Sequence, residues 1–302
     1  MLQLPSLRFR RQRVSPLKLF SLAVIACPSI LYLLLAYIVP TSPVLVPVSL
    51  LASRKPLLVT AHPDDESLFF GPTVLGLQKV GNAKHLRILV FSSGNNYGIG
   101  ETRKAEAKEA CKRIGAAECV VLDRKDIQDN PKVWWDQDVI KKVVKEKIKE
   151  WQSDSVLTFD SGGVSGHINH RAVSAAIVSL ATTSSSFPPT FMLRTVPTFV
   201  PPRKYIGILD LPLTCLRFTF RIMKAFVYNG QGREWTPLDV KNWAGYEKTG
   251  LFVSSWSTWR HNVGVFWAHE SQNSWDRRLY MLVSRYMWFN DITKVELKEK
   301  PT

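Results

Sequence analysis

Two clusters of polar residues in this sequence have the types and spacing that a hydrolytic site needs. The first is AHPDDE at residues 61–66, and the second is GHINH at residues 166–170. Together they offer imidazole and carboxylate groups, a ligand set that suits a catalytic Zn²⁺ with one position left open for water. Such a metal polarises a carbonyl oxygen, while a neighbouring carboxylate removes a proton from water. The clusters therefore predict hydrolysis of an amide without a serine or cysteine nucleophile.

Each part of this pattern has a simpler explanation when it is taken alone. A single histidine is more often a surface or hydrogen-bonded core residue than a ligand, and paired aspartates often cap helices. A bare H-x-x-H spacing is also a weak signal. The conjunction is more informative, because each cluster follows a stretch with the pattern of a buried strand.

Strand and helix patterns alternate between residues 55 and 196. The strands are predicted at 56–61, 87–93, 119–122, 155–159 and 191–196, and the best helices at 101–114 and 136–151. This alternation predicts a doubly wound α/β domain with a mainly parallel sheet. The first and fourth strands are then neighbours across the switch point, so the two polar clusters should meet over one crevice.

The N-terminal segment differs in composition from the rest of the chain. Residues 1–18 form a basic tail, residues 19–39 carry no charge, and residues 40–54 form a tether. At about 1.5 Å per residue, the uncharged run spans roughly the 30 Å core of a bilayer. A cleaved signal peptide has the same order, but its apolar part is usually about 7 to 15 residues long. We therefore favour an uncleaved transmembrane helix, followed by one catalytic domain at 55–302, in which 203–302 is a membrane-proximal tail.

The balance of 40 Lys+Arg against 25 Asp+Glu gives a formal charge of +15. This charge indicates an anionic neighbour, which could be nucleic acid, a membrane surface or a phosphate on the substrate. Nothing besides charge favours nucleic acid, so we do not expect that partner. The four cysteines have no C-x-x-C spacing and are predicted to be reduced.

Residues 213–224 have an amphipathic pattern. Thr214, Arg217, Arg221 and Lys224 recur on one side at helical spacing, and Leu213, Leu216, Phe220 and Met223 fill the other. A basic amphipathic helix of this kind can rest on anionic lipid headgroups. A helix that packs on the sheet explains the pattern equally well.

The two motifs and the segment 94–115 resemble the LmbE-like, or PIG-L, deacetylase family over roughly residues 56–180. The resemblance implies a Rossmann-like fold and a bound zinc or other divalent ion. It implies His62, Asp65 and His170 as metal ligands and Asp64 as the general base. His167 is then the group that stabilises the oxyanion or protonates the leaving amine.

Residues 94–100 contain a partial Gly-x-Gly pattern, but Arg103 stands where a third glycine would be. We therefore reject a dinucleotide site and expect a loop over the pocket. Asn95 in that loop, with Arg103 and Glu106 behind it, is a candidate for substrate binding. Arg103 and Glu106 could equally form an ordinary surface pair on their helix.

The GHxNH form, the N-terminal anchor and residues 267–290 look most like the membrane-anchored eukaryotic branch of the family. One departure from the bacterial relatives is that the second motif reads His-Ile-Asn-His and not His-Pro-Asp-His. The resemblance implies a glycolipid substrate, N-acetylglucosaminylphosphatidylinositol, whose deacetylation is an early step of GPI-anchor biosynthesis. The alternatives are a deacetylase of another N-acetyl sugar conjugate and a non-catalytic membrane scaffold.

The resemblance also implies a single-pass protein of the endoplasmic reticulum membrane whose catalytic domain faces the cytosol. The basic residues before the anchor predict the opposite orientation, by the positive-inside rule. We follow the resemblance, because unpaired cysteines are suited to a reducing compartment.

Overall fold

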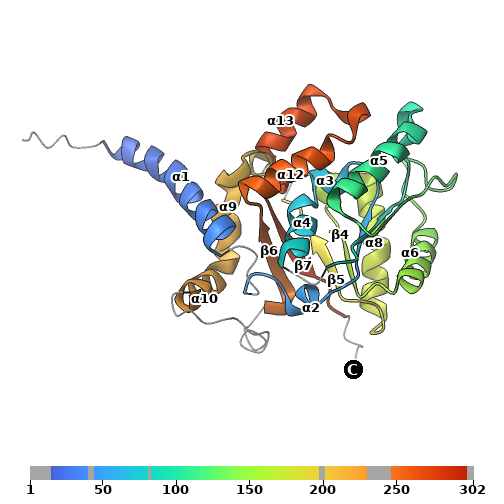
Figure 1. Ribbon diagram of the computed structural model, residues 1–302, viewed down its shortest axis with the longest axis horizontal. Coiled ribbons are helices and arrows are strands. Elements are labelled where there is room, and N and C mark those ends of the chain that lie inside the picture. Colours follow the sequence, from blue (N-terminus) through green and yellow to red (C-terminus); the bar gives the residue numbers. More distant parts are fainter. Residues whose placement is uncertain (1–14, 40–43, 81–82, 197–200, 230–245, 298–302) are drawn as a thin grey trace, which may run out of the picture.

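The computed structural model describes residues 15–39, 44–80, 83–196, 201–229 and 246–297. Its centre is a seven-stranded sheet with the order β3-β2-β1-β4-β5-β7-β6 (Figure 1). The strands are β1 (Pro56–Thr60), β2 (Arg87–Val90), β3 (Glu118–Val121), β4 (Ser155–Phe159), β5 (Thr190–Leu193), β6 (Thr249–Val253) and β7 (Phe289–Lys294). The first five strands pair in parallel, and β7 and β6 extend the sheet in antiparallel fashion.

Strand β1 lies next to β4, with Leu58 paired to Leu157. On the other side of β1 lies β2, so the chain order reverses at the β1–β4 boundary. This arrangement confirms the predicted doubly wound, Rossmann-like and mainly parallel α/β fold. The carboxyl ends of β1 and β4, which precede the two polar motifs, are therefore neighbours.

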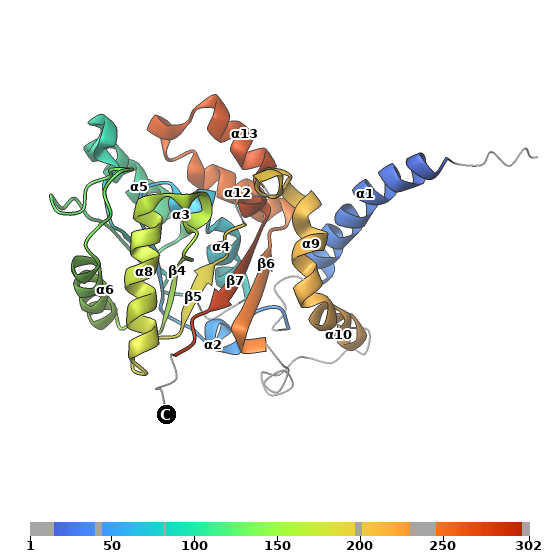
Figure 2. The same cartoon turned by 180° about the vertical axis from the view of Figure 1, so that it is seen from behind.

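Helices cover both faces of the sheet, as Figures 1 and 2 show. They include α4 (Gly71–Val80), α5 (Gly100–Ile114), α6 (Gln137–Trp151), α8 (Ile168–Thr183) and α12 (Trp256–Phe266). Alternate residues of a strand pack against the helices on opposite faces of the sheet, because successive side chains of a strand point to opposite faces. Leu58 packs in one buried cluster with residues of α4, α5 and α12, and Leu57 packs in another with residues of α6 and α8. The apolar strands are buried on both sides, as parallel strands normally are.

The last part of the chain completes the sheet and its core. It contributes β6, β7 and three helices: α12, α13 (Trp275–Val283) and α14 (Arg285–Trp288). Phe252 of β6 and Ile292 of β7 lie in the same buried cluster as Leu58 of β1, so residues 249–294 share the core of the α/β domain.

At the N-terminus, helix α1 (Pro16–Leu33) continues as a π-helical turn at Leu34–Ile38. In the described part of the chain, this segment alone is long and apolar enough to cross a membrane. In Figures 1 and 2, α1 projects away from the sheet and its covering helices. Its free part exposes apolar side chains such as Phe20 and Ile25, whereas Leu35 is buried against the domain.

The amphipathic stretch after residue 210 does not present its basic side to the outside, as a helix lying on lipid headgroups would. It consists of α9 (Leu211–Cys215), a short turn at Leu216–Phe218 and α10 (Thr219–Asn229). Arg221 is 5% exposed and donates to the carbonyl oxygens of Val44 and Thr249, both at 2.8 Å. The apolar side faces outward instead, with Leu216, Phe220 and Met223 exposed. The amphipathic period was therefore predicted correctly, but the basic face packs on the protein.

The prediction of four reduced cysteines is wrong for two of them. Cys111 at the end of α5 and Cys119 in β3 form a disulfide. The two residues are brought together because α5 turns at Gly115 into the neighbouring strand β3. The cysteines therefore give no support for a reducing compartment.

Candidate metal centre and catalytic cavity

The first motif forms a tight turn between β1 and the short helix α3 (Asp65–Leu68). Asp64 has a left-handed backbone conformation with φ 103°, which is rare for a residue with a side chain. The Oδ2 atom of Asp65 accepts hydrogen bonds from the amides of Ala61 at 3.1 Å and His62 at 2.8 Å. These bonds fold the turn back on itself. Strain of this kind is typical of functional sites.

The second motif lies at the start of α8, after β4 and a tight turn. His167 caps this helix, because its Nδ1 atom accepts from the amide of Asn169 at 3.3 Å. His170, one turn later, stacks on Phe159 of β4 with the ring centroids 4.2 Å apart. The Nδ1 atom of His170 donates to the carbonyl oxygen of Gly163 at 3.1 Å, which leaves Nε2 as the free lone pair.

Three candidate metal ligands converge between the two motifs. The Nδ1 atom of His62 lies 3.2 Å from Nε2 of His170, which in turn lies 3.3 Å from Oδ1 of Asp65. The Nδ1 atom of His62 is 3.9 Å from Oδ2 of Asp65. Ligand atoms of a tetrahedral zinc, at about 2.0 to 2.1 Å from the ion, are about 3.3 Å apart. The distances therefore fit one shared ion.

Asp129, which was not among the candidates from the sequence, orients His62. Its Oδ1 atom lies 3.2 Å from Nε2 of His62, on the side of the ring that faces away from His170. With its proton on Nε2, His62 presents a lone pair at Nδ1. Two imidazole lone pairs and a carboxylate then face one another with no proton between them, an arrangement that a cation satisfies.

Burial and charge separate the protonation of the two neighbouring aspartates. Burial raises the pKa of Asp64, and the charge of Asp65 raises it further, so that Asp64 can accept a proton. Burial acts in the same direction on Asp65, but His170 and His62 outweigh it and hold the pKa of Asp65 low. The two carboxylates are therefore suited to different tasks.

His167 lies on the same side of the cavity as the proposed ligands. Its ring centroid is 4.8 Å from that of His62, and the ligand atoms of His62, His167 and His170 all lie within 4.8 Å of one another. Burial, with the neighbouring His62 and His170, lowers the pKa of His167 to about 4. His167 is thus neutral near pH 7, and because Nδ1 accepts a bond, its proton is on Nε2.

Arg103 joins the site, whereas Asn95 and Glu106 do not reach its wall. Arg103 is buried, its Nη2 atom donates to the carbonyl oxygen of Pro63 at 2.7 Å, and it lies 3.6 Å from Oδ2 of Asp64. Asn95 accepts from the amide of Gly100, and Glu106 binds Ser271. A substrate contact by Asn95 or Glu106 stays a prediction.

The proposed metal ligands, Asp64 and His167 border one cavity of about 330 Å³. As expected, the loop after Gly94 covers it, through Asn96 and Tyr97. The tail contributes Gln272 and Arg277, which the sequence analysis did not identify. The residues of the two motifs that line the cavity are His62, Asp64, Asp65, His167 and His170, and Arg103 and Asp129 complete this part of the wall.

The last residue of the first motif, Glu66, forms a buried pair with His269 of the tail. Their Oε1 and Nε2 atoms are 2.6 Å apart, and both side chains are almost fully buried. The other oxygen of Glu66, Oε2, accepts from the amide of Asp64 at 3.1 Å. The tail therefore supports the strained turn that presents Asp64.

Replacing His269 with Ala should lower the free energy of unfolding by about 3 to 5 kcal/mol, because the Glu66 carboxylate would be left buried without its partner. Chemical denaturation of the purified protein measures this change. The exposed His261, which binds the carbonyl oxygen of Arg113, provides a matched control. An equal, small loss for His269→Ala and His261→Ala would show that the buried pair is not stabilising.

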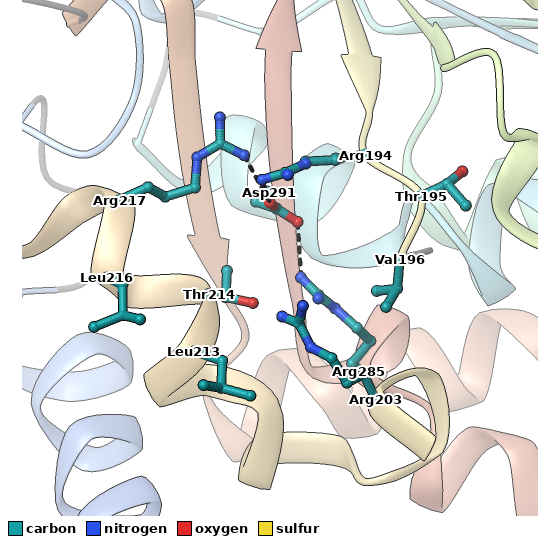
Figure 3. Close-up of a pocket in the computed structure, with 10 residues that line it drawn as sticks. All are labelled: Arg194, Thr195, Val196, Arg203, Leu213, Thr214, Leu216, Arg217, Arg285 and Asp291. Atoms are coloured by element: carbon teal, nitrogen blue, oxygen red, sulfur yellow. Dashed lines mark hydrogen bonds and ion pairs between the residues drawn. The ribbon is translucent and has the colours of Figure 1, made fainter. Parts of the chain in front are cut away.

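A second cavity, of about 190 Å³, is lined by four arginines and shares no residue with the catalytic one (Figure 3). Arg285 and Arg217 bind Asp291 of β7, with N–O distances of 2.7 and 3.3 Å. Arg203 and Arg285 also bind the buried Asp210. These pairs tie residues 203–217 to β7 and α14.

The chain is similar in sequence to deacetylases. The PIG-L family model, described as GlcNAc-PI de-N-acetylase, matches residues 57–181. The N-acetylglucosaminyl-phosphatidylinositol de-N-acetylase of Bos taurus is 35% identical over 240 residues, covering 79% of this chain and 82% of the relative. A probable enzyme of the same name from Dictyostelium discoideum is 30% identical over 279 residues, covering 83% and 96%.

The fold is similar to that of solved deacetylases with low sequence identity. A teicoplanin deacetylase in a zinc-inhibited form has a TM-score of 0.52 at 10% identity, covering 82% of this chain and 100% of that one. An A40926 pseudoaglycone deacetylase has a TM-score of 0.50 at 11% identity, covering 82% and 99%. These matches concern the arrangement of the sheet and helices.

Proposed function

Because the chain belongs to the PIG-L family of GlcNAc-PI de-N-acetylases, we propose that it hydrolyses N-acetylglucosaminylphosphatidylinositol to glucosaminylphosphatidylinositol and acetate, a step of GPI-anchor biosynthesis. The observation that carries the proposal is the convergence of His62, Asp65 and His170 beside the buried carboxylate of Asp64. These are the groups that water attack on an amide requires.

We further propose that His62 Nδ1, Asp65 and His170 Nε2 hold a divalent metal ion. A site with two imidazoles and one carboxylate suits zinc. When bound, the ion supplies Lewis-acid polarisation of the acetyl carbonyl and makes water easier to deprotonate. The opposed lone pairs of the two histidines support this assignment, because among the described residues the free nitrogens lie against one another and the carboxylate of Asp65.

The side chains around this centre divide the remaining chemistry. Asp64 takes a proton from the attacking water and can return it to the leaving nitrogen as the C–N bond breaks. His167 donates its Nε2 proton in a hydrogen bond to the carbonyl oxygen as negative charge develops there. A pKa near 4 makes His167 a poor proton source at neutral pH, which favours this role over protonation of the amine.

The choice of substrate is tested by acetate release from purified protein. N-acetylglucosaminylphosphatidylinositol should be hydrolysed faster than soluble N-acetylglucosamine conjugates that lack the phosphatidyl group. A preference for a soluble conjugate would instead favour a deacetylase of another N-acetyl sugar. Absence of acetate release from every substrate would favour the scaffold, although a scaffold has no need to keep Asp64 beside the ligand set.

We propose that α1 anchors the protein in the endoplasmic reticulum membrane, with the catalytic domain on the cytosolic side. The exposed apolar side chains of α1, together with Leu216, Phe220 and Met223, support contact with a bilayer. The family resemblance supports the cytosolic orientation, whereas the N-terminal charge and the Cys111–Cys119 disulfide are typical of the opposite side.

Protease treatment of intact microsomes tests the orientation. Digestion of the C-terminal domain without detergent is the expected result, because a cytosolic domain is accessible to the protease. A lumenal marker protein should stay intact in the same sample. Protection of the domain until detergent is added would reverse the orientation.

A further inference from the structure

Two cations line a cavity that adjoins the catalytic one. Lys204, in a short 3₁₀ helix at Pro201–Tyr205, and Arg277 of α13 border this cavity of about 300 Å³. It shares Phe69, Ser165 and Arg277 with the catalytic cavity. Arg277 therefore stands between the two spaces, and its positive charge acts on Asp64 on one side and on Lys204 on the other.

Within the described residues, neither cation forms an ion pair with a carboxylate. The Nζ atom of Lys204 donates to Ser165 Oγ at 2.6 Å, and it lies over the ring of Tyr205, 5.3 Å from the centroid. The side chain of Arg277 makes no hydrogen bond or ion pair with another residue of the described ranges. Burial, together with the charge of Arg277, lowers the pKa of Lys204 to about 8. An anion between the two cations would remove this electrostatic cost.

The arginine-lined cavity of Figure 3 provides a contrast within the same molecule. There, the carboxylate of Asp291 lies within 4.0 Å of three guanidinium groups, and Asp210 binds two. Each of the four arginines of that cavity is therefore paired with a carboxylate of the protein. Lys204 and Arg277 form no such ion pair with any described residue, and the carboxylate of Asp276, which also borders their cavity, accepts a hydrogen bond from Ser274. Cations without an ion-pair partner are the expected arrangement for a site that takes its negative charge from a ligand.

Part of the wall of the cavity next to the catalytic one is apolar. Tyr205, Leu279 and Val283 contribute to it. On α13, Trp275, Leu279 and Leu282 are spaced i, i+4 and i+7, and they are 78%, 50% and 56% exposed. Residues at this spacing lie on one side of a helix. An apolar stripe, formed by these three side chains, therefore runs from the cavity along the surface.

We propose that Lys204 and Arg277 bind the phosphodiester of the lipid substrate, while the apolar stripe of α13 contacts its glycerol and acyl chains. This inference rests on the proposed function, because in that substrate an inositol ring separates the acetylated sugar from the phosphodiester. A sugar in the catalytic cavity leaves the phosphate to occupy the neighbouring one. Ser165, which holds Lys204, is two residues from His167, so the same turn positions both groups.

The test compares two substrates that share the acetylated sugar. One is a short-chain N-acetylglucosaminylphosphatidylinositol, and the other is N-acetylglucosaminylinositol without the phosphodiester. For Lys204→Gln and Arg277→Gln, KM for the first substrate should rise by about tenfold to a hundredfold, because a charge-assisted bond to phosphate is lost. For both variants, kcat/KM should fall about tenfold more on the substrate with the phosphodiester than on the sugar without it.

Two controls separate binding from structure. Arg277→Lys, which keeps the charge, should recover most of the affinity. Arg278→Gln alters the adjacent exposed arginine, whose side chain binds Asn273, and should behave as wild type. Competitive inhibition by glycerophosphoinositol gives a second readout, which should weaken in Lys204→Gln and Arg277→Gln.

The outcomes distinguish this inference from the proposed function. Equal losses on both substrates, or unchanged KM and unchanged inhibition, would overturn the phosphate site while the deacetylase activity stands. A wild-type protein that is inactive on both substrates would refute the proposed function itself. A similar effect of Arg278→Gln would reduce the role of Arg277 to general surface charge.

Discussion

Replacing Asp65 with Ala should remove both the bound metal and turnover. Asp65 Oδ1 lies 3.3 Å from the free nitrogen of His170, so the substitution takes away the negatively charged ligand of the proposed site. The loss of metal affinity should exceed the 10- to 100-fold change that is typical when a residue that only orients a ligand is replaced. His62→Ala and His170→Ala should give the same double loss. Elemental analysis beside acetate release measures both quantities.

A control is needed because Asp65 also accepts two backbone hydrogen bonds within its turn. Asp65→Asn keeps an oxygen for these bonds but removes the negative charge. The variant should therefore remain folded, with an unfolding midpoint closer to wild type than that of Asp65→Ala, and still bind metal weakly. Stoichiometric metal in Asp65→Ala would show that another residue completes the site, with His167 as the nearest candidate.

Replacing Asp64 with Asn should leave the metal in place and lower the rate by about 10² to 10⁴, the usual contribution of general-base catalysis. Asparagine preserves the size of the side chain and its capacity for hydrogen bonding, but it cannot accept the proton. The side chain of Asp64 is not among the proposed metal ligands, since Asp65 and the two histidines face one another without it.

The comparison of the two variants is more informative than either result. If Asp64→Asn loses its metal while Asp65→Ala retains it, the roles of ligand and base are assigned to the wrong residues. Full activity of Asp64→Asn would remove the base from the mechanism. Arg278→Gln, prepared in parallel, controls for losses during purification.

The fold and the centre of the site followed from local patterns in the sequence. Buried parallel strands have continuous apolar runs, so β1 and β4 were recognisable, and the switch-point rule predicted that they would be neighbours. The pairing of Leu58 with Leu157 confirms this prediction. Because each motif follows its strand directly, His62 and His170 were expected to meet, and their facing nitrogens are 3.2 Å apart.

The parts that were missed depend on contacts between distant segments. His269 reaches Glu66 across about two hundred residues, and Asp129 lies in a long loop that has no periodic pattern. One clue was available, since β3 is parallel to β1 and β4, so the loop after β3 begins at the same edge of the sheet as the two motifs. Lys204 and Arg277 gave no sequence signal, because a cation that borders a cavity without an ion pair differs from a surface cation only in three dimensions.

The errors have a related cause. An amphipathic period shows that a helix has two sides, but it does not show which side the protein covers, so the buried Arg221 could not be foreseen. The spacing of Cys111 and Cys119 resembles no common disulfide motif. Their pairing depends on α5 and β3 being adjacent, which is a property of the folded chain.

The central claim, a metal-dependent deacetylation at the His62–Asp65–His170 centre, is tested most directly by acetate release from N-acetylglucosaminylphosphatidylinositol. The purified protein is assayed as isolated, after chelation, and after zinc is restored. The account predicts release as isolated, loss after chelation, and recovery only when the ion returns to a chain with all three ligands intact. Undiminished acetate release from protein shown to be free of metal would contradict it.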